Sequence, residues 1–111
     1  MEHVTLFQAQ PIPNWGEKIH QFLCNPSKFD ALPKHRHKQL QEESRRYAII
    51  GKQLYRRGMD GQLRLCVCEN EYIHVLHCVH SGVGAGHFSG KSTAKQIIYS
   101  GLWWPTLYGN A

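Results

Sequence analysis

A β-hairpin signal lies in the middle of the chain. Residues 53–57 and 62–67 have the alternating or β-rich composition of strands, and they flank Gly58-Met-Asp-Gly61. An Asp-Gly pair between two such stretches indicates a hairpin, because both residue types accept the positive φ angles of tight turns. Residues 47–50, just upstream, are also rich in residues that favour strands. The sequence therefore predicts a small antiparallel sheet, and the remaining elements must pack around it.

Two helical patterns precede the hairpin. Asn14 is a suitable N-cap for a helix that begins at Trp15, and Asn25-Pro26 ends that helix. Pro33 suits the first turn of a second helix, which runs to about Tyr47 and carries interleaved charges on its exposed face. Both helices have apolar residues at helical spacing, so each offers one face to a core.

Helical patterns also follow the hairpin. Acidic residues in a first turn predict a helix from Glu69 to Gly82, where a glycine-rich loop begins. A further helix is expected over residues 91–99, started by Ser89 and ended at Gly101. A last short helix is expected to begin at Trp103. The C-terminal part of the chain is therefore predicted to be helical.

These elements predict an α+β fold, in which two N-terminal helices and a small antiparallel β-hairpin sheet are followed by a small helical segment. We divide the chain into an extended leader over residues 1–13, the helices and hairpin over 14–68, and the helical segment over 69–111. The length of 111 residues suits one small domain, and an apolar content of 41% allows a modest core.

The composition also bears on the cellular setting. No apolar run approaches the roughly 20 residues that span a bilayer, and the N-terminus lacks the basic and apolar regions of a signal peptide. We therefore expect an intracellular protein, in the nucleus, the cytoplasm or both, that is not secreted and has no membrane partner. In that setting the cysteines are expected to be thiols or metal ligands rather than disulfides.

A glycine-rich stretch separates His80 from His87, and Gly101-Leu-Trp-Trp-Pro-Thr-Leu107 follows it. With the strand sequences Leu54-Tyr-Arg-Arg57 and Leu63-Arg-Leu-Cys-Val67, this order of motifs resembles the N-terminal extension and the His-His-Cys-Cys zinc-binding domain of Ty3/gypsy-type retrotransposon integrases. The resemblance extends over nearly the whole chain and depends on several unrelated motifs in the same order. It implies an extension domain of helices and a small sheet, followed by a helical zinc-binding segment.

By this resemblance, His80 and His87 are the first two ligands of a zinc ion. The family takes the other two from a Cys-x-x-Cys pair after the Trp-Pro segment, and the sequence stops at Ala111 before such a pair. A structural zinc site needs four ligands, so zinc held by two would bind weakly. Cys66, Cys68 and Cys78 are candidates to complete the shell, and sharing between two chains is an alternative. Cys66 and Cys78 also suit simple packing on a strand and a helix.

Two kinds of catalysis lack the acidic residues that their chemistry needs. Ala85-Gly-His-Phe-Ser-Gly-Lys-Ser92 matches a relaxed phosphate-loop pattern, but a nucleotide-hydrolysing fold needs an acidic residue for magnesium further along the chain. The 19 residues after Ser92 contain no Asp or Glu. The acidic catalytic domain of an integrase is also absent from the sequence. We therefore expect no enzymatic activity.

Basic residues give the chain a formal net charge of +5, which permits contacts with nucleic-acid phosphates. They gather over Lys34 to Lys38 with Arg45-Arg46, and along the hairpin. A solvated helix face and an exposed hairpin explain the same pattern equally well. The candidate nucleic-acid contacts are Lys52, Arg56, Arg57, Arg64, Lys91 and Lys95.

An aromatic cluster lies near the C-terminus of the sequence, at Tyr99, Trp103, Trp104 and Tyr108. Packing of the helical core, with one tryptophan inside, is the simpler interpretation. A large exposed apolar patch would favour a protein partner or self-association, so Trp103, Trp104 and Tyr108 are candidate partner-binding residues.

The leading functional prediction is a non-enzymatic binding module derived from a retrotransposon integrase, with weak, non-specific binding to nucleic acid, to protein or to both. The alternative is a domesticated retroelement remnant that acts as a protein-interaction factor and binds neither zinc nor DNA. The salt dependence of DNA binding separates the two, since phosphate contacts weaken steeply as salt rises.

Overall fold

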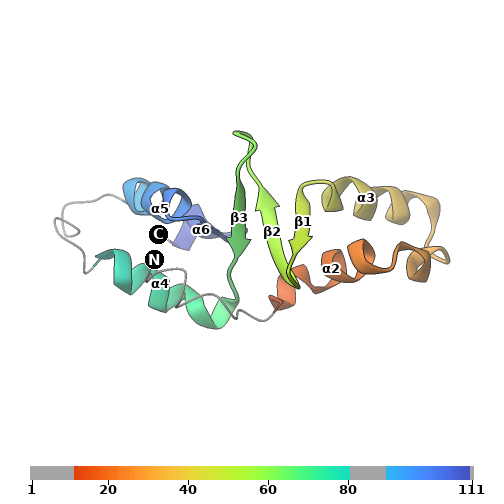
Figure 1. Cartoon of the computed structure of the whole chain (residues 1–111), viewed down its shortest axis with the longest axis horizontal. Coiled ribbons are helices and arrows are strands. Elements are labelled where there is room, and N and C mark those ends of the chain that lie inside the picture. The colour runs from red at the N-terminus through yellow and green to blue at the C-terminus, as the bar shows by residue number, and fades with distance from the viewer. Residues whose placement is uncertain (1–11, 81–89, 111) are drawn as a thin grey trace.

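A computed structural model describes residues 12–80 and 90–110 (Figure 1). The predicted α+β class is confirmed, because helices surround a small mixed sheet. The helical elements are η1 (Asn14–Gly16), α2 (Glu17–Cys24), η2 (Pro26–Phe29), α3 (Lys34–Ser44), η3 (Glu69–Glu71), α4 (Tyr72–His80), α5 (Gly90–Tyr99) and α6 (Leu107–Asn110). The strands are β1 (Tyr47–Ile50), β2 (Gln53–Arg57), β3 (Leu63–Cys66) and β4 (Leu102–Trp103).

The sheet has the order β1-β2-β3-β4. The first three strands are antiparallel neighbours, as the hairpin pattern predicts, and β4 pairs with β3 in parallel. The β1–β2 turn consists of Gly51 and Lys52, both with positive φ (54° and 68°). Two such residues in a two-residue turn match the twist of antiparallel strands.

The prediction of a helix from Trp103 onward is wrong, because this residue belongs to β4. Gly101 adopts a φ of 95°, which ends α5 and turns the chain back alongside β3. The amide of Val67 then donates to the carbonyl of Trp103 at 3.0 Å. Pro105 disfavours helical backbone at the residue before it, so α6 begins only at Leu107.

Several predicted helix boundaries differ from the structure. The helices expected from Trp15 and from Glu69 open with the 3-10 turns η1 and η3 before α2 and α4 begin. Pro33 precedes the first residue of α3 instead of lying inside it. The same helix ends at Ser44, before Tyr47, because Tyr47 starts β1 and its ring is buried in the core. The expected helix end at Gly82 and the expected start at Ser89 lie outside the described residues.

Buried side chains form two hydrophobic clusters. The N-terminal cluster consists of Ile19, Phe22, Leu40, Tyr47, Leu54 and Cys66. The C-terminal cluster consists of Val67, Val75, Ala94, Ile97, Leu102, Trp104 and Leu107. Trp15 and Trp103 pack against both. The division at residues 68 and 69 stays a prediction, although the clusters share these two rings.

The sheet stands between two groups of helices, with α2 and α3 beyond β1 and α4, α5 and α6 beyond β3 (Figure 1). The molecule is accordingly elongated, with extents of 51 × 25 × 25 Å. The β2–β3 turn projects past the helices at one end of the sheet (Figure 1). In the described part of the chain, no helix has the length and apolar character needed to cross a membrane.

Candidate nucleic-acid interface

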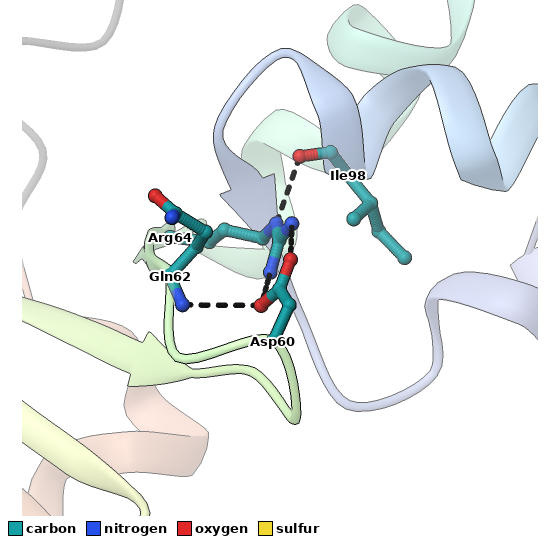
Figure 2. A network of polar contacts seen from close by, with 4 residues as sticks. All are labelled: Asp60, Gln62, Arg64 and Ile98. Carbon is teal, nitrogen blue, oxygen red and sulfur yellow. Dashed lines mark hydrogen bonds and ion pairs between the residues drawn. The ribbon is translucent and has the colours of Figure 1, made fainter.

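The β2–β3 turn is tied to the end of α5 by Arg64 (Figure 2). The guanidinium of Arg64 donates from Nη1 and Nη2 to the two carboxylate oxygens of Asp60, at 3.1 and 2.8 Å. Its Nε donates to the carbonyl oxygen of Ile98 at 2.9 Å. A cation at the last carbonyls of a helix is favourable, because those oxygens carry the negative end of the helix dipole. Arg64, with only 12% of its side chain exposed, therefore holds the turn against α5.

Arg56 is held in place by aromatic rings. Its guanidinium lies 4.5 Å from the ring centroid of Trp103 and 5.2 Å from that of Tyr47. Its Nη1 also donates to the Tyr47 hydroxyl at 3.1 Å. A guanidinium over an aromatic face is attracted by the negative face of the ring. Arg56 thus joins β2 to β4 through side chains, and it contributes a fixed positive charge.

These two arginines form part of a groove of about 900 Å³ across the sheet. One side comes from the α3–β1 connection and β2, the other from α5 and α6 beyond β3, and the β2–β3 turn adds to the lining (Figure 1). The lining residues are Arg45, Arg46, Arg56, Arg57, Gly58, Met59, Asp60, Arg64, Lys95, Ile98, Tyr99, Trp103 and Tyr108. We call this feature the basic groove.

The cations at the rim of the basic groove are exposed. Arg45, Arg46 and Arg57 gather on one side because the amide of Arg57 donates to the carbonyl of Arg46 at 2.7 Å. Lys95 is exposed on α5, on the other side. Within the described residues, the carboxylate of Asp60 is the one acidic group in the lining, and it pairs with Arg64. The basic groove therefore carries a large excess of positive charge.

Two tyrosines present their rings to solvent in the same groove. Tyr99 ends α5 with 79% of its surface exposed, and Tyr108 on α6 is 55% exposed. The hydrogen bond that Arg64 donates to Asp60 is the largest cause that raises the pKa of Arg64, and smaller electrostatic effects of Tyr99 and Tyr108 act in the same direction. Arg64 lines the same groove, and the carbonyl to which its Nε donates belongs to Ile98, the residue before Tyr99.

The aromatic residues predicted to bind a partner divide into three situations. Trp104 is 0% exposed and its ring stacks on Tyr72, with centroids 4.3 Å apart and planes at 13°. Contrary to expectation, Trp104 is not available to a partner, because it is the centre of the C-terminal cluster. Trp103 is partly buried under Arg56, and only Tyr108 is well exposed. The simpler interpretation, core packing, therefore holds for Trp104.

Four of the six predicted nucleic-acid contacts line the basic groove, namely Arg56, Arg57, Arg64 and Lys95. Lys52 lies instead in the β1–β2 turn, at the opposite end of β2 from the β2–β3 turn. The side chain of Lys91 lies outside the described residues.

Sequence reasoning missed three lining residues as contacts. Arg45 and Arg46 belong to the basic region noted in the sequence, but their charge alone does not show that they face the hairpin. Tyr99 belongs to the aromatic cluster, and its exposure at the end of α5 depends on the tertiary fold. An Arg-Arg pair directly before a predicted strand is the one signal that could have found the first two.

The candidate metal ligands lie in different environments. Cys66 belongs to the N-terminal cluster, and burial raises the pKa of its thiol to about 12. Zinc binds the thiolate, so Cys66 acts in this fold as a small apolar core residue. Cys68 is also buried, with a thiol pKa raised mainly by burial, whereas Cys78 is exposed.

Within the described residues, no group of three or more His, Cys, Asp or Glu side chains lies close enough to hold a metal ion. The side chain of His80 and the whole of His87 fall outside that description. A zinc ion held by these two histidines, alone or shared between two chains, stays a prediction. Comparisons of the chain with protein-family models, with curated proteins and with solved structures find no match.

Proposed function

We propose that this chain is a non-enzymatic binding module of Ty3/gypsy-type integrase origin, and that it binds nucleic acid weakly and without sequence preference through the basic groove. The integrase origin is supported by the order of the hairpin, histidine and Trp-Pro motifs along the chain. The observation that carries the binding function is the gathering of Arg45, Arg46, Arg57 and Lys95 around one open groove.

Exposed positive side chains attract the phosphates of a nucleic acid, but they do not distinguish one base from another. The exposed cations come from three separate elements, so a nucleic-acid backbone that follows the groove can meet several of them at once. Each phosphate that is neutralised releases counterions, and four such contacts give a slope of about −3.6 in a plot of log affinity against log salt for B-form DNA. Affinity without sequence selectivity is expected, because specificity comes from contacts to base edges.

The test is a salt titration of binding to a labelled DNA duplex of arbitrary sequence, followed by fluorescence anisotropy. We expect the double variant Arg57→Gln with Lys95→Gln to lower the magnitude of the salt slope by about 2, because each lost phosphate contact removes about 1. The matched control is Lys18→Gln with Lys28→Gln, which removes the same charge from exposed sites outside the basic groove. Equal slopes for the two double variants would refute the groove as the binding site.

The alternative function, a protein-interaction factor that binds no DNA, is favoured by the exposed apolar side chains at the same groove. Met59 is fully exposed at the β2–β3 turn, and Tyr99 and Tyr108 line the opposite side. Under this alternative the duplex titration gives no salt-dependent signal, and the native mass of the purified protein reports self-association.

Zinc analysis of the same sample tests the His80 and His87 prediction, with one ion per chain or one per dimer as the two positive outcomes.

A further inference from the structure

We propose that the preferred ligand of the basic groove is a single-stranded nucleic acid, whose phosphates meet the rim cations while its bases stack on Tyr99 and Tyr108. This inference rests on the proposed function and names the form of nucleic acid that the same site takes.

The composition of the basic groove distinguishes single strands from duplexes. A duplex presents phosphates on its outside and hides the faces of its bases, so exposed rings beside the cations would find no partner. A single strand offers phosphates and unstacked bases together, and proteins that bind it combine a positive groove with aromatic stacking platforms. Tyr99 and Tyr108 are exposed rings of this kind in a groove whose rim carries Arg45, Arg46 and Arg57.

The two tyrosines are placed to act together. Tyr99 is the last residue of α5, and Tyr108 lies in the first turn of α6, so both belong to the same side of the basic groove. Arg64 lines the same groove, and its Nε donates to the carbonyl of Ile98, the residue before Tyr99. A strand that follows the groove therefore has stacking surfaces on one side and most of the exposed cations on the other.

The base of the groove is rigid before any ligand arrives. Arg64 is held by two hydrogen bonds to Asp60 and one to Ile98, and Arg56 is held against the Trp103 ring. Fixed charges and a fixed groove reduce the entropy that binding must cost. The long side chains of Arg45, Arg57 and Lys95 remain exposed and can adapt to a flexible backbone.

Charge complementarity selects an anionic ligand, and the rings select among anions. An acidic peptide would satisfy the arginines but would leave Tyr99 and Tyr108 without a flat partner. Stacking of a base on an aromatic side chain contributes roughly 1–3 kcal/mol, which corresponds to a loss of about 5- to 150-fold in affinity when the ring is removed. The change in affinity on removal of the Tyr99 or Tyr108 ring therefore distinguishes a single-stranded nucleic acid from an acidic peptide.

The experiment compares the affinity of the full chain for oligothymidylate, for oligouridylate and for a hairpin duplex with the same number of phosphates, at one salt concentration. We expect both single strands to bind more tightly than the duplex. Tyr99→Ala and Tyr108→Ala should each reduce single-strand affinity by about 5- to 150-fold and leave duplex affinity within about twofold. The variants Tyr99→Phe and Tyr108→Phe should retain single-strand affinity, because the ring remains.

Ile73→Ala is the matched control, since it removes an equally exposed apolar side chain from α4, outside the groove. Equal affinity for single strand and duplex, or single-strand affinity that survives both alanine substitutions, would overturn the inference and leave the proposed function standing. Displacement of the oligonucleotide by polyglutamate at equal charge concentration would also overturn it, in favour of an acidic peptide. Failure to bind any nucleic acid would refute the proposed function itself.

Discussion

The four cysteines, all within the described residues, occupy two environments. Cys66 and Cys68 are buried next to the core, whereas Cys24 and Cys78 are exposed on helices. Each exposed thiol has a histidine one helical turn before it, and the Sγ of Cys78 lies 3.8 Å from Nε2 of His74. A thiol reacts faster when it ionises readily and when the reagent can reach it, so the exposed cysteines should be far more reactive than the buried ones.

We predict that iodoacetamide at pH 8 modifies Cys24 and Cys78 in the folded protein, and modifies Cys66 and Cys68 only after denaturation. Burial holds the pKa of Cys66 at about 12, so its thiolate is scarce at that pH, and the core keeps the reagent out. Peptide mass spectrometry after timed labelling checks this. Labelling of Cys66 as fast as that of Cys78 would contradict the buried position of β3.

A second residue-scale prediction concerns Gly16. A Cβ at this buried position would lie 2.6 Å from Cδ2 of Leu54, which is itself fixed inside the N-terminal cluster. We expect Gly16→Ala to lower the free energy of unfolding by about 1–3 kcal/mol, because the core must shift to admit the methyl group. Gly109→Ala is the control, since its Cβ would meet nothing within 4 Å. Urea unfolding of both variants measures the difference, and equal stabilities would show that η1 does not press on β2.

Between elements, Arg64 joins the β2–β3 turn to α5, because it pairs with Asp60 of the turn and donates to the carbonyl of Ile98. The hydrogen bond from Arg64 is the main cause that lowers the pKa of Asp60 from 3.8 to about 2, and the amide of Gln62 adds to it. Because the folded pKa lies below the unfolded one, the carboxylate stabilises the fold fully above pH 3.8. That contribution is lost as the pH falls through 2.

We therefore predict an NMR titration midpoint near pH 2 for the Asp60 carboxyl, and a midpoint closer to 3.8 in Arg64→Leu. Arg57→Leu, which removes an arginine from the neighbouring strand, should leave the midpoint unchanged. A midpoint near 3.8 in the unmodified protein would mean that the turn does not contact Arg64 in solution.

At the scale of the whole molecule, the two hydrophobic clusters are joined by shared aromatic rings. Trp15 and Trp103 stand edge to face with centroids 5.8 Å apart, and both pack against the two clusters. The indole Nε1 of Trp15 also donates to the carbonyl of Val67 at 3.3 Å. Parallel pairing of β4 with β3 adds backbone hydrogen bonds across the same junction. These contacts couple the helical segment to the sheet.

We predict that Trp104→Ala lowers the free energy of unfolding by about 3–5 kcal/mol, because a large buried ring leaves a cavity in the C-terminal cluster. Tyr108→Ala, which removes a side chain that is 55% exposed, should change it by less than about 0.5 kcal/mol. Urea unfolding followed by circular dichroism and by tryptophan fluorescence should give one coincident transition in the unmodified protein. Separate transitions would show that the clusters unfold independently, against the coupling through Trp15 and Trp103.

Sequence reasoning reached the features that depend on neighbouring residues. The Asp-Gly turn, the alternation around it and the Asn-Pro stop after the first helix are local signals, so the hairpin and four main helices lie close to their expected positions. The basic groove was only partly predicted. Arg57 and Lys95 were assigned to nucleic acid from their charge, but their position on opposite sides of one groove with Tyr99 depends on how α5 packs against the sheet.

The α+β class, the presence of the hairpin and the positive charge follow from the sequence alone, because side-chain period, turn chemistry and ionisable groups act over a few residues. The parallel pairing of Leu102–Trp103 with β3 emerges only in the folded chain, since it joins β3 to a segment far along the sequence. The exposure of Trp103, Trp104 and Tyr108 likewise depends on the tertiary structure. Burial depends on what packs against a ring, and no local pattern specifies that.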